Sequence, residues 1–456
     1  MENLILYIII LIASNYFFIK SESVILLPLK VDEISDDENF EISKLESSKI
    51  YTEINIGNPN QKVKLYLSFN FYLTYIFNEQ SNGYYNQLIS STYKNISKST
   101  YYSSPFEKGF ESNETFYMGT YNNSVLEIKN FSFDLITEIN KNFNTKSGIL
   151  GLKLFDNTYR GDPVRNIIVQ LKKRHFIESY SWSINFKNNG EGILGIGAYP
   201  HEYDKENYST EFFKQILSGW RPTGVFWEIE FTNIITGYGN YIEKTRKCEM
   251  QIETGLIFGT DEYFDLVKKE FFEEKISQNE CFLDTATSTY YLNFKYFYCS
   301  NIDIIKQFKG IHFKNNDLDK DFFFDYNDLF LKRNNKYYFL IAFRPSSNVN
   351  WIIGYPFFKK YEFVFQPDKK LIGTYIGYPK AKDEKNNNDK DNTNDNHTSV
   401  IILSCFVGIF AITIIILSVF LFKKFSKNFK KKRANELDDN FDYTSPPEEN
   451  KLFNNE

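Results

Sequence analysis

The sequence predicts a mainly β protein built as two lobes, and three observations carry that prediction. Tyrosine and phenylalanine are abundant, with 33 and 46 copies in 456 residues, and aromatic side chains favour strands, although codon bias also explains such a composition. Strand-like runs recur between turns rich in Asn, Gly and Asp. Two runs, residues 64–70 (KLYLSFN) and 250–255 (MQIETG), share one design, an apolar strand that enters a tight loop. We expect each lobe to contribute one of these loops.

The order of the expected elements agrees with that class. Strands are expected at residues 51–56, 63–67, 124–128, 131–136, 180–186, 226–231, 337–343 and 361–365. Helices are expected at residues 164–173, 210–217 and 262–274. Because strands far outnumber helices, the pattern favours a mainly β fold. We place the N-terminal lobe at residues 49–215 and the C-terminal lobe at residues 216–378.

Charge and motif content exclude several function classes. The net charge is -5 and the main body has no basic block, so nucleic-acid binding is not expected. The four histidines are scattered, and neither an HExxH nor a CxxC motif occurs. We therefore expect no metal site and no cofactor.

The N-terminal residues predict entry into the secretory pathway. Residues 1–22 are an apolar run that ends in polar sequence, which is typical of a cleaved signal peptide. Glu2 stands where a positive residue is usual, so an uncleaved anchor is the alternative. Residues 23–48 form either a short pro-segment or the first strand and a loop. They are acidic, which does not fit a basic pro-segment.

The C-terminal residues predict a single membrane helix. Residues 379–399 are polar and of low complexity, as in a flexible stalk. Residues 400–422 are apolar or small and long enough to span a bilayer. The basic residues that follow are Lys423, Lys424, Lys427, Lys430, Lys431, Lys432 and Arg433. They place the tail, residues 423–456, in the cytosol. We expect a single-pass type I protein of the secretory pathway or cell surface, whose N-terminal body is luminal or extracellular.

This topology gives meaning to the N-x-S/T sequons, the acceptor motif of N-glycosylation. The sequons begin at Asn95, Asn113, Asn122, Asn130, Asn207 and Asn396. All lie on the predicted luminal side, so we expect several of them to carry glycans.

Six motifs, in order and at similar spacing, resemble those of the pepsin-like aspartic protease family (peptidase family A1). They are residues 51–61 (YTEINIGNPNQ), the strand ending at Ser68, residues 146–152 (KSGILGL), residues 180–186 with 190–197 (YSWSINF, GEGILGIG), residues 253–255 (ETG), and residues 351–358 with 361–366 (WIIGYPFF, YEFVFQ). The resemblance covers residues 48–378. It implies a bilobal fold in which one loop from each lobe reaches a central cleft. Gly151 and Gly354 would let a neighbouring strand approach the base of each loop.

The resemblance also shows what this chain lacks. The family's mechanism needs two carboxylates that share a proton, and the matching positions here are Ser68 and Glu253. A serine hydroxyl is a neutral donor and acceptor, and glutamate is one methylene longer than aspartate. The Thr-Gly that follows the first position is replaced by Phe69-Asn70. We therefore expect a degenerate dyad. The other residues of the two loops expected to line the cleft are Asn70, Thr254 and Gly255.

Two placements stay open. Asp284, in residues 283–288 (LDTATS), is an alternative for the second loop. Cys248 and Cys299 argue against it, because family cysteines stand at similar distances from the loop at Glu253. The family's mobile flap corresponds to residues 106–117, with Phe110 or Tyr117 as the equivalent of its tyrosine. Packing within an aromatic hairpin is the alternative role for both.

The cysteines allow one disulfide in the globular region. Three lie there, an odd number, so at most one bond forms and one thiol is left. Cys281–Cys299 is preferred, because both flank one strand pair, and Cys248–Cys281 competes with it. Cys405 lies in the predicted membrane helix, where a small apolar role is the default.

The resemblance and the missing aspartates together favour a membrane-anchored, catalytically inactive homologue that binds a peptide or protein in the interlobe cleft. One alternative is an active, atypical aspartic endopeptidase that uses Ser68 and Glu253. The other is an adhesion or receptor-like ectodomain in which the cleft plays no part.

Overall fold

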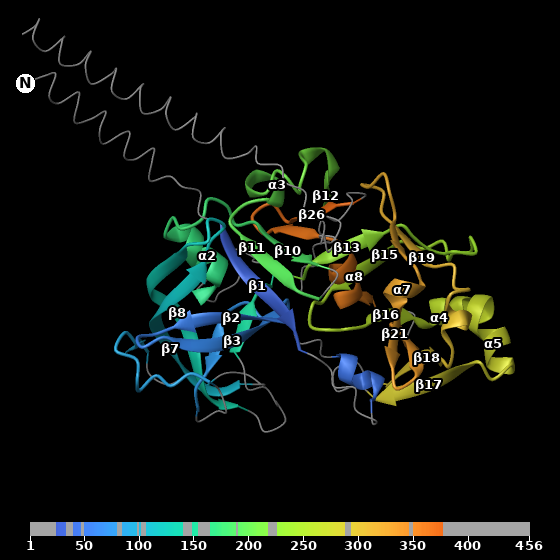
Figure 1. Cartoon of the computed structure of the whole chain (residues 1–456), viewed down its shortest axis with the longest axis horizontal. Helices are drawn as coiled ribbons and strands as arrows, with labels where there is room; N and C mark the ends of the chain where they lie inside the picture. Colours follow the sequence, from blue (N-terminus) through green and yellow to red (C-terminus); the bar gives the residue numbers. More distant parts are fainter. Residues whose placement is uncertain are drawn as a thin grey trace, which may run out of the picture. The chain divides into compact units, whose positions relative to one another are not determined.

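The computed structural model describes a body that is mainly β (Figure 1). The described residues are 24–32, 40–46, 50–79, 84–97, 100–101, 106–139, 148–153, 165–187, 190–217, 226–287, 293–345 and 350–376. The predicted signal peptide, stalk, membrane helix and tail lie outside them, as does Asn396. Within the described residues, no helix is both long and apolar enough to cross a bilayer.

A large sheet of 14 strands holds the N-terminal half and also takes in strands from the C-terminal end. Its order is β12-β26-β25-β10-β11-β1-β2-β3-β9-β4-β8-β7-β5, with β6 paired to β7. Its strands are β1 (Ile25–Val31), β2 (Ile50–Ile56), β3 (Gln61–Ser68), β4 (Tyr75–Phe77), β5 (Lys94–Asn95), β6 (Thr100–Tyr101), β7 (Phe106–Gly119), β8 (Val125–Ile139), β9 (Gly148–Gly151), β10 (Trp182–Phe186), β11 (Gly192–Ile196), β12 (Phe213–Leu217), β25 (Phe363–Gln366) and β26 (Leu371–Tyr375). Because β25 pairs with β10, strands of both predicted lobes share one sheet.

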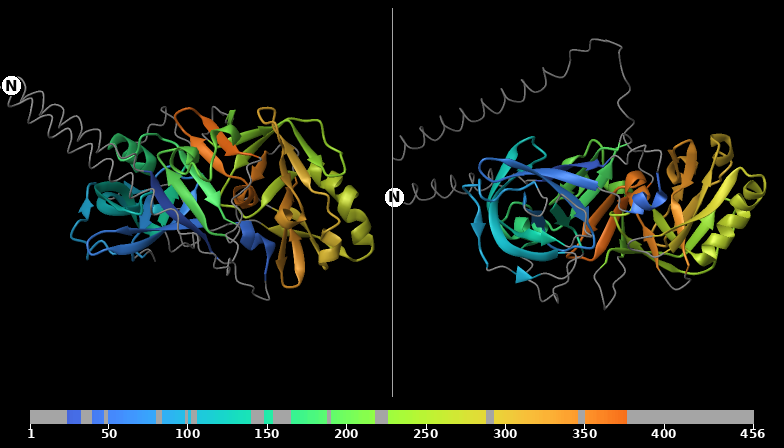
Figure 2. Two further views of the ribbon diagram at one scale, coloured as in Figure 1. Left: turned by 45° about the horizontal axis from the view of Figure 1, so that its top comes forward. Right: turned by 90° about the horizontal axis from the view of Figure 1, so that it is seen from below.

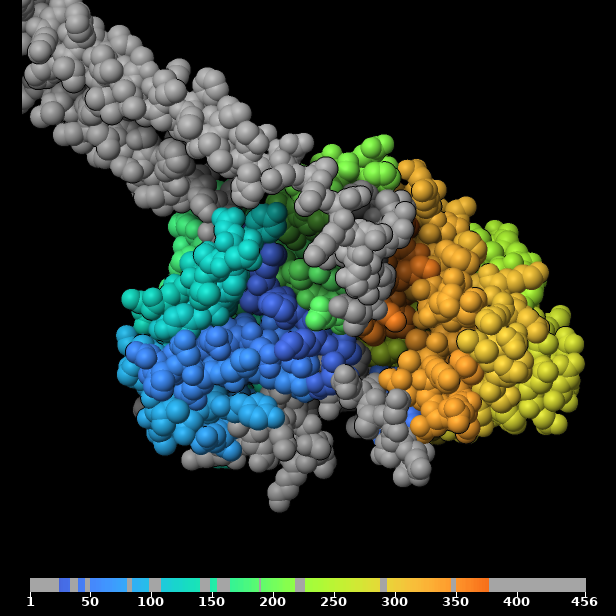
Figure 3. Space-filling model, viewed as in Figure 1, coloured from blue at the N-terminus to red at the C-terminus, as the bar shows by residue number. Residues whose placement is uncertain are grey.

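Two further sheets build the C-terminal half. The larger has 9 strands in the order β13-β15-β24-β16-β23-β18-β22-β21, with β17 paired to β18, and the smaller has the order β14-β19-β20. Their strands are β13 (Glu228–Phe231), β14 (Asn233–Thr236), β15 (Arg246–Met250), β16 (Ile257–Thr260), β17 (Cys281–Thr287), β18 (Asn293–Cys299), β19 (Ile311–Lys314), β20 (Phe322–Phe324), β21 (Phe330–Arg333), β22 (Lys336–Phe339), β23 (Ile341–Arg344) and β24 (Trp351–Ile353). The yellow and orange strands of this half form a block separate from the blue and cyan strands (Figures 2 and 3).

The helices are short and lie between strands. The helical elements are η1 (Ile42–Glu46), α2 (Ile167–Lys173), α3 (Pro200–Tyr203), η4 (Thr210–Phe212), α4 (Asp261–Val267), η5 (Lys268–Phe272), α5 (Glu273–Ser277), α6 (Ile302–Ile305), α7 (Tyr326–Leu329) and α8 (Tyr355–Lys360). The side chain of Asn166 caps α2 by accepting from the backbone N–H groups of Ile168 and Val169.

Most predicted elements are present, with strand ends shifted by one or two residues, and three differ. Residues 210–217, predicted as a helix, form η4 and then β12, because pairing of β12 with β26 outweighs the local helical pattern. Residues 337–343 form two strands, since the Leu340 N–H leaves the ladder and donates to the Leu329 carbonyl at 2.7 Å. Residues 124–128 and 131–136 belong to one strand, β8.

Candidate functional site

Two loops with the same backbone surroundings form the centre of the described fold. β3 ends at Ser68 and runs parallel to β9, with Ser68 opposite Gly151. β15 ends at Met250 and runs parallel to β24, with Met250 opposite Ile353. We call residues 68–70 the first loop, residues 253–255 the second loop, and both together the central site.

A glycine beside each loop is required by close backbone contact, as predicted. A Cβ on Gly151 would lie 2.5 Å from the Leu73 carbonyl oxygen. A Cβ on Gly354 would lie 2.2 Å from the Leu256 oxygen and 2.4 Å from the Thr254 oxygen. Such distances exclude a side chain, so both strands depend on glycine to reach the loops.

Ser68 and Glu253 contact each other directly across the central site. The Ser68 hydroxyl donates a hydrogen bond to Glu253 Oε1. The same oxygen accepts from the backbone N–H of Phe69 at 2.6 Å and of Asn70 at 3.0 Å. A carboxyl of the second loop is therefore bound by three donors of the first loop, and the extra methylene of glutamate allows this reach.

The two oxygens of the Glu253 carboxyl have different surroundings. Oε1 has the three donors, whereas Oε2 has no solvent contact and no hydrogen-bond partner among the described residues. The residue as a whole keeps some exposed surface, so it is the carboxyl end that is buried. This burial raises the pKa of Glu253, and the hydrogen bonds from Ser68, Asn70 and Phe69 offset only part of the rise.

Phe69 anchors the first loop in the aromatic core. Its side chain is 2% exposed, and its ring centroid lies 5.5 Å from Trp182, 5.6 Å from Phe358 and 5.3 Å from Phe365. All three contacts are edge-on, a geometry that favours aromatic pairs beyond simple burial. The side chain therefore points into the core and does not crowd the loop.

Thr254 holds the second loop by hydrogen bonds. It is fully buried, and its hydroxyl oxygen accepts from the Leu256 N–H at 3.2 Å. Its carbonyl accepts from the Tyr355 N–H at 2.7 Å. Asn70, at the matching end of the first loop, is exposed. Its backbone N–H donates to Glu253 Oε1 at 3.0 Å and to the Ser68 hydroxyl oxygen at 3.2 Å.

The other candidate residues lie in strands and are not part of either loop. Asp284 is exposed in β17, where its carboxylate accepts from the Tyr296 hydroxyl at 3.1 Å, so the described second loop is the one at Glu253. Phe110 in β7 is opposite Leu135 of β8. Tyr117, further along β7, is opposite Asn55 of β2.

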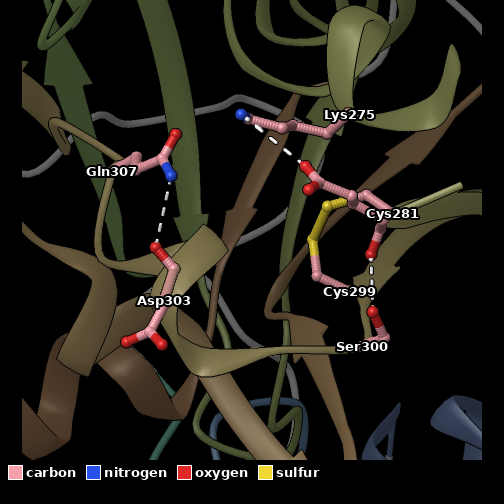
Figure 4. Close-up of a disulfide and its surroundings, with 7 residues drawn as sticks. Lys275, Cys281, Cys299, Ser300, Asp303 and Gln307 are labelled. Carbon is pink, nitrogen blue, oxygen red and sulfur yellow. Dashed lines mark hydrogen bonds and ion pairs between the residues drawn. A yellow bond between two sulfur atoms is a disulfide. The ribbon is translucent and has the colours of Figure 1, made fainter. Parts of the chain in front are cut away.

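The preferred disulfide is present (Figure 4). Cys281 and Cys299 are bonded and stand opposite each other in the β17–β18 pair. Ser300 donates from its hydroxyl to the Glu280 carbonyl at 3.1 Å, next to the bond. Cys248 is a buried free thiol, and burial raises its pKa well above the usual value.

The described sequons differ in accessibility. Asn95, Asn122, Asn130 and Asn207 are exposed. Asn113 is half-buried in the middle of β7, where its side-chain oxygen accepts from the Ser132 hydroxyl at 2.7 Å.

Two further features lie apart from the chemistry of the central site. A cavity of about 450 Å³ is lined by Val24, Glu178, Ser179, Gly197, Ala198, Tyr199, His201, Glu202 and Lys205, none of which belongs to either loop. The described residues contain no group of three or more His, Cys, Asp or Glu side chains arranged to hold a metal ion.

Two halves that each bring one loop to a shared centre define a two-lobed β protein of pepsin-like architecture. A model of the eukaryotic aspartyl protease family matches residues 49–375, and the chain belongs to this family. Its fold is similar to that of basic 7S globulin from soybean, with a TM-score of 0.55 and 10% identity over 78% of this chain and 97% of that one. No curated protein sequence matches this chain.

Two parts of the central site were not predicted from the sequence. The first is the use of the backbone N–H groups of Phe69 and Asn70 as donors to Glu253. The second is a bond from the Gly255 N–H to the Leu45 carbonyl at 2.7 Å. The apolar spacing of Phe40, Ile42 and Leu45 within an acidic segment was the available signal for the second.

Proposed function

We propose that this protein is a membrane-anchored, pepsin-like homologue that does not cleave peptides and instead binds a peptide or protein. Ser68 and Glu253 take the positions of the family's two catalytic aspartates in this proposal. The observation that carries it is the direct hydrogen bond from the Ser68 hydroxyl to Glu253.

This contact does not fit the chemistry of an aspartic protease. That reaction needs one carboxylate as a base toward a water and a second carboxyl as an acid toward the peptide carbonyl. The central site has one carboxyl, and burial raises its pKa. The hydroxyl of Ser68 is held as a donor to Glu253 Oε1, and it cannot replace a carboxylate as a base. Glu253 could therefore fill only the role of the acid toward the peptide carbonyl.

Membrane anchoring belongs to the same proposal. Residues 400–422 are long and apolar enough to form a helix across a bilayer, and the basic residues after them favour a cytosolic tail. The body would then be luminal or extracellular, with Asn95, Asn122, Asn130 and Asn207 exposed for glycosylation. A half-buried position in a paired strand makes Asn113 the least accessible of the described sequons.

Proteolysis by the purified full-length chain tests the proposal. A peptide library incubated with the wild type across acidic and neutral pH should show no cleavage, and the Glu253→Gln variant should give the same result. Cleavage by the wild type that is lost in Glu253→Gln would overturn the proposal in favour of an atypical endopeptidase.

A restored variant serves as the positive arm. Ser68→Asp combined with Glu253→Asp supplies two carboxylates of family length on a backbone whose glycine contacts are intact. If this variant cleaves peptides while the wild type does not, the loss of activity lies in these two side chains.

A further inference from the structure

A segment at one edge of the large sheet has an unusual distribution of side chains. Residues 84–97, which we call the rim, contain β5, the last strand in the order of the 14-stranded sheet. β5 pairs antiparallel with β7, and the Ile96 N–H donates to the Glu111 carbonyl of β7 at 2.9 Å. The light-blue part of the chain, which contains the rim, reaches the molecular surface (Figure 3). The rim is thus attached through its backbone to an edge of the sheet.

Several polar side chains of the rim point inward, toward one buried carboxyl group. Glu114 of β7 is fully buried. Its Oε2 accepts from the hydroxyls of Tyr85 and Ser90, each at 2.6 Å. Its Oε1 accepts from the Thr92 hydroxyl and from the Thr115 N–H, the latter at 2.7 Å. Because a buried polar group is costly without hydrogen bonds, these contacts hold the rim in one arrangement.

Large apolar side chains of the rim point outward instead. Tyr84, Leu88, Ile89 and Ile96 are 56%, 83%, 55% and 53% exposed. The rim has no acidic residue and one basic residue, Lys94. Natural proteins often protect a sheet edge from pairing with other chains by placing charged side chains on it, and this edge has a single charge. The rim is therefore an exposed apolar surface, of the kind that marks a contact or an aggregation site.

An acceptor motif for N-glycosylation lies inside this surface. Residues 95–97 (NIS) form a sequon, and its asparagine is exposed. Its middle residue is Ile96, one of the exposed apolar side chains. Two more sequons are adjacent, since Asn113 stands opposite Lys94 in the β5–β7 pair and Asn130 Oδ1 accepts from Lys94 Nζ at 3.2 Å. A protein partner on this edge would have to dock among these sequons, so their position favours a glycan as the cover.

We propose that an N-glycan on Asn95 covers the apolar rim and prevents copies of this chain from associating through that edge. Such a glycan is bulky and solubilising, and its attachment point lies within the rim itself. A chain that lacks it presents Leu88, Ile89 and Ile96 beside a sheet edge, and this arrangement favours contact between copies. The proposal rests on the luminal or extracellular placement proposed above, because the sequon is used in secreted proteins.

Glycan occupancy and particle mass together test this proposal. The full-length chain is expressed in a glycosylating eukaryotic host and placed in detergent-free lipid nanodiscs, loaded with a single chain per disc. Peptide mass spectrometry gives the occupancy of each sequon, and light scattering gives the mass of the particles. The test variant is Asn95→Gln. The matched control is Asn207→Gln, which removes an exposed sequon outside the rim.

Asn95 of the wild type should carry a glycan, and the wild-type and Asn207→Gln discs should stay separate. The Asn95→Gln discs should form dimers or larger assemblies at the same concentration, because the rim is then uncovered. Adding Leu88→Ser and Ile89→Ser to Asn95→Gln should restore separate discs, since it removes two of the exposed apolar side chains. A wild type without a glycan on Asn95, an Asn95→Gln variant that stays separate, or association that persists in the triple variant would each overturn the proposal.

Removal of the glycans after folding covers the case in which Asn95→Gln does not fold. An endoglycosidase trims the glycans of the folded wild type, which should then associate. The Leu88→Ser, Ile89→Ser variant, trimmed in the same way, should not. A trimmed wild type that stays separate would contradict the proposal.

Failure of this proposal is distinguishable from failure of the proposed function. Peptide cleavage by the wild type overturns the proposed function without changing the particle mass. A wild type with a glycan on Asn207 and none on Asn95 has the expected placement and overturns only the role of the rim glycan. A wild type without glycans on either residue overturns both that role and the luminal placement.

Discussion

At the end of β3 an aromatic side chain holds the first loop, whereas at the end of β15 a threonine holds the second. Phe69 packs against three aromatic rings, and Thr254 makes two hydrogen bonds through its hydroxyl and its carbonyl. Both loops nevertheless keep the same strand pairing and the same need for a neighbouring glycine. Different residues thus secure the same backbone arrangement in the two loops.

The largest loss of stability should come from substitution of the glycine beside each loop, because both loops need it. Gly354→Ala places a Cβ 2.2 Å from one backbone oxygen and 2.4 Å from another, and we expect it to cost more than about 5 kcal/mol or to prevent folding. Gly151→Ala should be similarly severe. Gly190→Ala is the control, because its φ is +83° but its Cβ would meet no atom within 4 Å, and it should cost about 1–2 kcal/mol. Denaturant unfolding gives the three values, and a mild Gly354→Ala would contradict the equivalence of the two loops.

The difference between the loops predicts unequal costs for their anchors. Phe69→Ala removes a buried ring from an aromatic cluster and should cost about 3–5 kcal/mol in the free energy of unfolding. Thr254→Ala removes one hydroxyl hydrogen bond and should cost about 1–2 kcal/mol. Unfolding in urea measures both, and equal costs would show that the two loops are held in the same way.

Glu253→Gln should show how the carboxyl that joins the loops responds to pH. The pKa of Glu253 is raised in the folded state, so its contribution to stability is greatest below the unfolded pKa and is lost as pH rises toward the folded pKa. Glutamine keeps the acceptor oxygen but does not ionise. The variant should melt at about the same temperature as the wild type at acidic pH and at a higher temperature at neutral pH. A wild type that is the more stable of the two at neutral pH would mean that the three donors favour the ionised form.

Ser68→Ala should have the smallest effect. It removes one of the three donors to Glu253 Oε1 and should cost about 1 kcal/mol. Loss of that donor also raises the pKa of Glu253 further. When the melting temperature is measured over the same pH range, the loss of stability in the Ser68→Ala variant should therefore extend to higher pH than in the wild type. An unchanged pH profile would show that the two backbone donors are sufficient.

Local pattern was enough to predict much of this protein. Alternating apolar residues predicted most strands, and the requirement for glycine at 151 and 354 followed from the motifs around them. The pairing of Cys281 with Cys299 followed from their place at the ends of one strand pair. The identities of Ser68 and Glu253 are a property of the sequence itself, and they limit the chemistry wherever the side chains point.

Contacts between distant segments were decided only by the tertiary structure. Residues 213–217 became a strand because β26 was available for pairing. Phe69 turned into a core formed by rings from three other segments, and residues 40–46 crossed to the C-terminal half. The reach of Glu253 to the Phe69 and Asn70 N–H groups depends on the distance between two loops that are 183 or more residues apart in sequence. Periodicity and motif spacing describe neighbours along the chain, and these contacts depend on how sheets from the two halves meet.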